Sequence, residues 1–221
     1  PSERLGAICA RLINSLNSDA GEPFYNRITQ QGMPSTSKTC LTIPALKEAL
    51  RRSGLLGRAA SNNTVYEIGA LCGRTDADSL DRARSGLNEY FGLLRNANLV
   101  EWESGRDGHL CTNVAVQAYI MLLGSLVKYW EANTASDARE MAVEDIMIEV
   151  EEYLKPLLDL LESSNASQIK TAFQVPFGSG GPPEYYYRLC KLIKTKYSDF
   201  QPEGMQEWEE EQSEDRIQEA D

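Results

Sequence analysis

Apolar side chains recur at three- and four-residue spacing through most of this 221-residue chain, a pattern typical of helices that bury one face. The first such segment covers about residues 3 to 17. A second follows Thr42, whose hydroxyl can cap a helix with Pro44 in its first turn, and it ends at Ser53-Gly54. The other segments with helical spacing are 76–94, 113–130, 143–161, 167–173 and 183–197.

The segment from Val114 to Trp130 is apolar on nearly every side, so it predicts a central, buried helix. In the next helix, Pro156 predicts a kink or a break near residues 153–155 because proline cannot donate the helical hydrogen bond. The pattern as a whole predicts an all-α bundle wrapped around the Val114–Trp130 helix. We expect residues 1–200 to form one domain, since this length allows a substantial buried core.

The polar segment from Asp19 to Lys38 separates the first two helices. Short extended pieces at residues 25–29 and 39–41 predict two marginal strands that pair as a hairpin. Residues 58–63 have the composition of a loop, and the short apolar segment 65–72 fits either a helix or a strand.

The net charge of −11 is concentrated at one end of the chain. Residues 203–221 hold nine of the 33 acidic residues and one of the 22 basic residues, so residues 1–202 carry 24 acidic and 21 basic residues. The body is therefore close to neutral. Residues 201–221 are expected to form an acidic, disordered tail, because few apolar groups there offset the entropy of ordering.

Cysteine and histidine content argues against a metal or redox motif. The five cysteines are scattered without a CxxC pair, and the single histidine, His109, cannot complete a usual zinc ligand set. An odd number of scattered cysteines fits reduced thiols in a cytoplasmic protein, with most of them serving as small core residues. No apolar run approaches 18 residues, so we expect no contact with a membrane. The chain starts at Pro1 and enters a helical pattern at once, which predicts that it is part of a longer protein.

Three segments invite a chemical interpretation, but the pattern favours a structural one for each. Asp107-Gly108-His109 lacks a nucleophile or second acid at a recognisable spacing, and it fits a polar turn. Gly178-Ser-Gly-Gly181 precedes a helix as phosphate-binding loops do, yet it lacks the lysine and threonine of a P-loop and fits a connector. The acidic residues between Glu144 and Glu152 have no Glu-x-x-His partner and fit a solvated face. We therefore predict no catalytic residue, metal or cofactor.

Basic and aromatic side chains mark two candidate binding surfaces. One basic cluster follows the second helix, and another lies on the last helix; their members are Arg51, Arg52, Arg58, Arg188, Lys191 and Lys194. Such clusters can contact DNA phosphates, although basic residues near the C-terminus of a helix also simply complement its dipole. Three consecutive tyrosines, Tyr185, Tyr186 and Tyr187, predict a docking surface that follows the glycine-rich loop.

Several stretches together resemble one protein family. The first helix is followed by Pro23-Phe-Tyr-Asn-Arg-Ile28 and Leu41-Thr-Ile-Pro-Ala-Leu46, which look like the region downstream of the signature in DGQHR-domain proteins. Leu87-Asn-Glu-Tyr-Phe91, Trp102 and the apolar helix after it are similar to the next block of that family, and the Gly178–Tyr187 segment resembles the end of its larger members. The matches span most of residues 1–200.

This family includes the DndB-like proteins of DNA phosphorothioation clusters, which pair an α/β domain with a helical C-terminal part. The resemblance implies a non-catalytic helical scaffold or interaction domain in a DNA-modification or phage-defence system, with roles in DNA binding or transcriptional regulation. Its expected partners are an upstream α/β domain of the same protein, DNA and other DNA-modification proteins. No Asp-Gly-Gln-His-Arg run occurs in this chain, so no catalytic residue is carried over.

Two other functional classes stay open at the level of sequence. One is a small nucleotide- or phosphate-binding unit that uses the Gly178–Gly181 loop together with Arg188 and the tyrosines. The other is a freestanding helical regulator whose acidic tail mimics nucleic acid.

Overall fold

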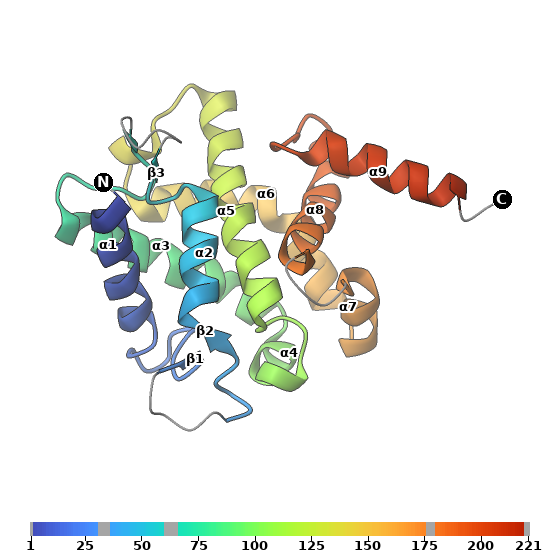
Figure 1. Cartoon of the computed structure of the whole chain (residues 1–221), viewed down its shortest axis with the longest axis horizontal. Helices are drawn as coiled ribbons and strands as arrows, with labels where there is room; N and C mark the ends of the chain where they lie inside the picture. Colours follow the sequence, from blue (N-terminus) through green and yellow to red (C-terminus); the bar gives the residue numbers. More distant parts are fainter. Residues whose placement is uncertain (1, 31–35, 60–65, 176–179, 219–221) are drawn as a thin grey trace.

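The computed structural model describes residues 2–30, 36–59, 66–175 and 180–218, which form helices and two short pairs of strands (Figure 1). The all-α fold predicted from the sequence is confirmed. Two 3-10 turns, η1 (Gly105–Asp107) and η2 (Ala138–Glu140), lie between the helices. The helices are α1 (Ser2–Leu16), α2 (Ile43–Ser53), α3 (Asp76–Ala97), α4 (Leu99–Glu103), α5 (Asn113–Thr134), α6 (Val143–Ser163), α7 (Ala166–Phe173), α8 (Gly181–Lys194) and α9 (Met205–Gln218).

Helix α5 runs through the middle of the bundle, between α2 and α8 (Figure 1). Half of its 22 residues are buried, from Ala115 to Trp130, because apolar side chains surround the helix rather than follow one stripe. The predicted central helix is therefore confirmed. Tyr90 of α3 donates a 3.1 Å hydrogen bond to the carbonyl oxygen of Tyr119 and so satisfies its hydroxyl inside the core.

Side-chain caps fix where several helices begin. The hydroxyl of Thr42 accepts a hydrogen bond from the amide of Ala45 at the start of α2, as the sequence predicts. Thr75 and Thr112 cap α3 and α5 in the same way. Thr75 thus lies directly before Asp76, the first residue of α3.

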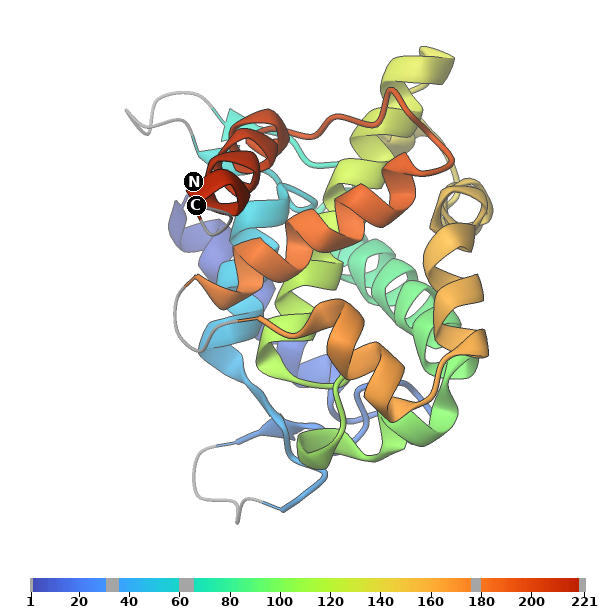
Figure 2. The same ribbon diagram turned by 90° about the vertical axis from the view of Figure 1, so that its right-hand side faces the viewer.

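Helix α6 continues as one element through Pro156. Figure 2 shows the two halves of this helix running in different directions, so the proline is accommodated by a kink and causes no break. Val150, Leu154 and Leu157, on both sides of the proline, are all buried in the core.

The first pair of strands corrects the predicted hairpin. Strands β1 (Ile28–Thr29) and β2 (Leu41–Thr42) do pair, but they run parallel, with Ile28 opposite Leu41. A hairpin reverses the chain through two to five residues, whereas the connection here is longer and lets the chain return in the same direction. Asn17 fixes the arrangement by accepting a 3.0 Å hydrogen bond from the amide of Ile28.

A second pair of strands resolves the ambiguous segment near residue 65. Strands β3 (Arg58–Ala59) and β4 (Tyr66–Glu67) are antiparallel, with Arg58 opposite Glu67. The stretch expected as a loop therefore begins as a strand, and the short apolar segment contributes a strand rather than a helix.

The acidic C-terminal segment also differs from its expectation. The sequence predicted a disordered tail, whereas the structure has α9, which projects away from the bundle (Figure 1). Its first turns are attached through Met205, which is fully buried, and Trp208, whose ring stacks on Tyr187 with the centroids 5.6 Å apart. Lys194 adds an ion pair to Glu209 at 2.8 Å. These contacts attach the start of α9 to the bundle, although the acidic composition of the segment predicts that it is solvated.

Candidate binding groove

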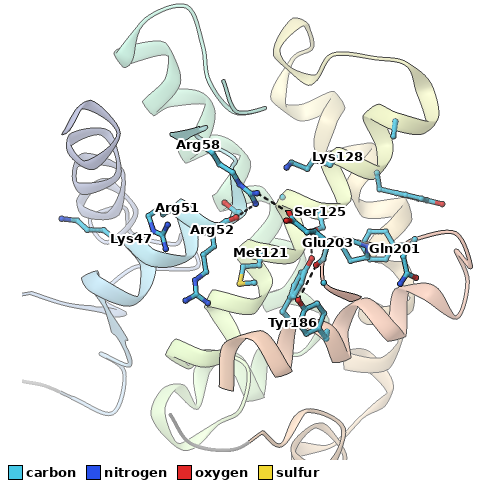
Figure 3. Close-up of a pocket in the computed structure, with 18 of the residues that line it drawn as sticks. Lys47, Arg51, Arg52, Arg58, Met121, Ser125, Lys128, Tyr186, Gln201 and Glu203 are labelled. Carbon is cyan, nitrogen blue, oxygen red and sulfur yellow. Dashed lines mark hydrogen bonds and ion pairs between the residues drawn. The ribbon is translucent and has the colours of Figure 1, made fainter. Parts of the chain in front are cut away.

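A cavity of about 1020 Å³ opens between α1, α2, α5, α8 and the segment that connects α8 to α9 (Figure 3). Apolar and aromatic side chains of its wall come from α1, α5, α8 and the segment after α8, whereas α2 contributes only polar and charged ones. The apolar and aromatic side chains include Leu5, Cys9, Met121, Tyr129, Tyr186 and Phe200. A concave, largely apolar surface of this size is typical of a ligand- or partner-binding site.

Cationic side chains from three elements line this groove. Helix α2 contributes Lys47, Arg51 and Arg52, strand β3 contributes Arg58, and α5 contributes Lys128 (Figure 3). We call these five residues the basic rim. Lys47, Arg51, Arg52 and Lys128 are exposed, so their charges face solvent above an apolar floor.

Acidic neighbours reduce the charge of the basic rim. Glu48 accepts hydrogen bonds from Arg51 at 2.7 Å and from Arg52 at 2.7 Å. The hydrogen bond from Arg51, followed by the one from Arg52, lowers the pKa of Glu48 to about 2. This carboxylate therefore stays ionised at neutral pH. Arg58 lies 3.8 Å from Glu203, which is almost fully exposed. Glu48 therefore forms ion pairs with two of the five cations of the basic rim.

The structure brings together only one of the two predicted basic clusters. Arg51, Arg52 and Arg58 line the groove, as expected for a shared surface. On α8, Arg188 pairs with Glu184 at 2.9 Å, and Lys194 pairs with Glu209. Lys191 is exposed on the same helix but does not line the groove. Two of the three basic residues predicted on the last helix thus form ion pairs within α8 or between α8 and α9.

The three consecutive tyrosines occupy three different environments, which corrects the predicted docking surface. Tyr185 is a core residue: its hydroxyl lies 3.1 Å from that of Tyr119, and burial raises its pKa well above the ordinary value. Tyr186 lines the groove, and its hydroxyl lies 2.7 Å from that of Ser125. Tyr187 stacks on Trp208 at the edge of the groove. Successive residues of a helix point about 100° apart, so three in a row cannot share one face.

Sequence analysis missed Lys47 and Lys128. Lys47 lies one turn before Arg51 on the same face of α2, a spacing that could have revealed it. Lys128 lies far from both in sequence, and only the packing of α5 against α2 brings it to the groove. Phe200 and Gln201 join the groove because the chain folds back after α8.

The polar turn near His109 and the glycine-rich loop before α8 are the other two candidate sites from the sequence. Residues 105–107 form η1, and the amide of His109 donates to the buried Glu101 at 3.1 Å, which fits a polar turn before α5. Gly178 and Ser179 of the glycine-rich loop lie outside the described residues; Gly180 is the N-cap residue of α8, which begins at Gly181. Within the described ranges, no cluster of three or more His, Cys, Asp or Glu side chains could hold a metal ion.

Among the described helices, none combines the length with the apolar character that spanning a bilayer requires.

Comparisons with known proteins add no further constraint. No family model, curated protein or solved structure matches the chain. The fold is all-α, and the groove is lined by cationic, apolar and aromatic side chains.

Proposed function

We propose that this chain is a non-catalytic helical interaction domain that binds DNA along the groove. The observation that carries the proposal is that five cations from α2, β3 and α5 line one groove. Basic side chains arranged along one groove provide the contacts to phosphates that dominate the affinity of proteins for nucleic acids.

Single-stranded DNA is the form that suits this groove best. A groove for single strands combines cations, which follow the backbone, with aromatic side chains on which bases stack. Here the rim supplies the cations, and the partly exposed Tyr129 supplies an aromatic side chain in the groove wall, whereas Tyr186 and Phe200 are buried. In an intact duplex the bases stay stacked inside the double helix, so only its phosphates can contact the protein, through the basic rim. We therefore expect tighter binding to a single-stranded oligonucleotide than to a duplex of the same length.

The biological setting follows from the resemblance to DGQHR-domain and DndB-like proteins. We propose that the chain is the helical part of such a protein in a DNA-modification or phage-defence system. In this arrangement an upstream α/β domain carries any reaction chemistry. The helical part contributes contacts to DNA and to other proteins of the system.

Removing cations of the basic rim is expected to lower the affinity for DNA. The affinity should also depend less steeply on the salt concentration. In the Lys47→Gln/Lys128→Gln variant, two phosphate contacts are lost, so the slope of log K against log salt falls by about 1.4 for a single strand. Fluorescence anisotropy with a labelled oligonucleotide at several salt concentrations measures this slope. The loss of affinity should be similar for different sequences, because phosphates carry no sequence information.

The matched control is Lys155→Gln/Lys170→Gln, which removes the same two charges from exposed positions on α6 and α7, away from the groove. It should bind as the unaltered protein does. Equal slopes for the double variant, the control and the unaltered protein would show that the rim does not contact DNA.

Removing the acid of the rim should have the opposite effect. Glu48→Gln releases Arg51 and Arg52 from their shared carboxylate, so the affinity for DNA should rise and the slope should steepen by up to about 1.4. Because its folded pKa is lowered, Glu48 stabilises the fold above its unfolded pKa of about 4.3, and this contribution disappears as the pH falls toward 2. At neutral pH the variant should lose at most about 1 kcal/mol, since the arginines are largely exposed.

Glu162→Gln, at an exposed position on α6, is the corresponding control for net charge. If both variants bind more tightly by the same factor, the gain comes from the overall charge and not from the rim. A gain confined to Glu48→Gln assigns it to the two arginines.

A further inference from the structure

Two cysteines that are distant in sequence meet beside the first pair of strands. The Sγ atoms of Cys40 and Cys111 lie 3.4 Å apart, although 71 positions separate the residues. Cys40 is half-buried and directly precedes β2, whereas Cys111 is buried and lies just before α5. The two thiols therefore join the chain segments that lead into α2 and α5.

Hydrogen bonds hold the segment around Cys40 in place on both sides. The amide of Thr42 donates to the side-chain oxygen of Asn113 at 2.9 Å, which ties the segment to the start of α5. The amide of Leu41 donates to the carbonyl oxygen of Arg27 at 2.9 Å, and the Arg106 guanidinium donates to that of Thr39 at 3.1 Å. The approach of the two sulfur atoms is thus a fixed feature of the packing.

The surroundings differentiate the two thiols. The hydrogen bond between the two thiols lowers the pKa of Cys40, and the charges of Arg27 and Arg106 lower it further against the effect of burial. The same hydrogen bond, followed by burial, raises the pKa of Cys111. Burial also raises the pKa of Cys9 to about 11 and that of Cys190 to about 12. Cys40 is half-buried whereas Cys111 is fully buried, so an oxidant reaches Cys40 first, and Cys40 is suited to be the attacking thiol and Cys111 the resolving thiol.

We propose that Cys40 and Cys111 form a dithiol site that hydroperoxides oxidise reversibly to a disulfide. The Cys40 thiolate attacks one oxygen of hydrogen peroxide, the O–O bond breaks, hydroxide leaves, and Cys40 becomes a sulfenic acid. The sulfur of Cys111 then forms the S–S bond, the S–O bond breaks, and water leaves with the thiol proton. The two thiols lose two electrons in total, and the peroxide is reduced to two molecules of water.

The structural change that this reaction requires is small. A disulfide has an S–S bond of about 2.05 Å, so the sulfur atoms must approach by about 1.4 Å. The closed loop of about 70 residues removes much conformational freedom from the unfolded chain, which stabilises the oxidised protein. The inference is independent of DNA binding, because it uses no residue of the basic rim.

Treatment of the reduced, full chain with hydrogen peroxide tests the site. After alkylation under denaturing conditions, mass spectrometry should show the loss of two alkylatable thiols and a peptide cross-link between Cys40 and Cys111. Dithiothreitol should restore both thiols. The melting temperature of the oxidised protein should rise by about 5 to 15 °C.

Three variants distinguish this site from general oxidation. In Cys111→Ser, Cys40 should stop at the sulfenic acid and be trapped by dimedone, whereas Cys40→Ser should show no such adduct at Cys111. Cys72→Ser alters another half-buried thiol, whose Sγ lies 3.2 Å from the carbonyl oxygen of Leu56, and should leave the disulfide intact. Five free thiols after treatment, or a cross-link between any other pair, would overturn the proposal.

Discussion

Replacing Trp102 with alanine is expected to destabilise the protein by about 3 to 5 kcal/mol, a large part of the stability of a typical domain. Its side chain is fully buried on the short helix α4, where it packs against the rings of Phe24 and Phe91, which also contact each other. Its Nε1 donates a 3.2 Å hydrogen bond to the carbonyl oxygen of Pro23. The alanine variant therefore leaves both a cavity and an unpaired buried carbonyl group.

Urea unfolding followed by far-UV circular dichroism measures this effect. Trp102→Phe keeps most of the apolar volume but loses the hydrogen bond, so its loss should be smaller than that of alanine. Val100→Ala, at a position 78% exposed on the same helix, should lie within about 0.5 kcal/mol of the unaltered protein. A loss of less than 1 kcal/mol for Trp102→Ala would mean that α4 does not close this part of the core.

The second large effect is expected at Gly124, where α5 crosses α2. A Cβ atom added there would lie 2.4 Å from the carbonyl oxygen of Ser53. Real Cβ atoms do not approach a backbone oxygen so closely, so the two helices must separate. We expect Gly124→Ala to lower the free energy of unfolding by about 1 to 3 kcal/mol, although alanine is the better helix former.

Gly92→Ala provides a matched comparison in α3. A Cβ at Gly92 meets no atom within 4 Å, so the same substitution should raise the stability by about 0.5 to 1 kcal/mol. The two variants differ only in what surrounds the added methyl group, and opposite signs in urea unfolding are the expected result. Stabilisation by both substitutions would show that α2 and α5 pack less closely than the structure has them.

Gly124 also links stability to the candidate site, because it lies in the wall of the groove between α2 and α5. Separation of these helices would move Lys47 and Arg51 away from Lys128. The Gly124→Ala protein should therefore bind DNA more weakly than the Gly92→Ala protein under conditions in which both are folded. The same oligonucleotide assay measures this difference.

The sequence allowed part of the groove to be predicted. Arg51, Arg52 and Arg58 lie close together along the chain, so local spacing was sufficient to group them. Lys128 reaches the groove from another helix through tertiary packing alone. The docking surface assigned to Tyr185, Tyr186 and Tyr187 failed for a related reason. Helical geometry sends adjacent side chains in different directions, and the neighbours of each tyrosine decide whether it is buried.

Local pattern by itself determined helices α1 to α3 and α5 to α8, the Thr42 cap and the central place of α5. These features depend on residues within one or two turns of each other, where spacing and capping chemistry act directly. Only the tertiary structure decided the parallel direction of β1 and β2, the attachment of α9, the assembly of the basic rim and the meeting of Cys40 with Cys111. Each of these joins segments that are separated in sequence, and their relative positions follow from how the whole core packs.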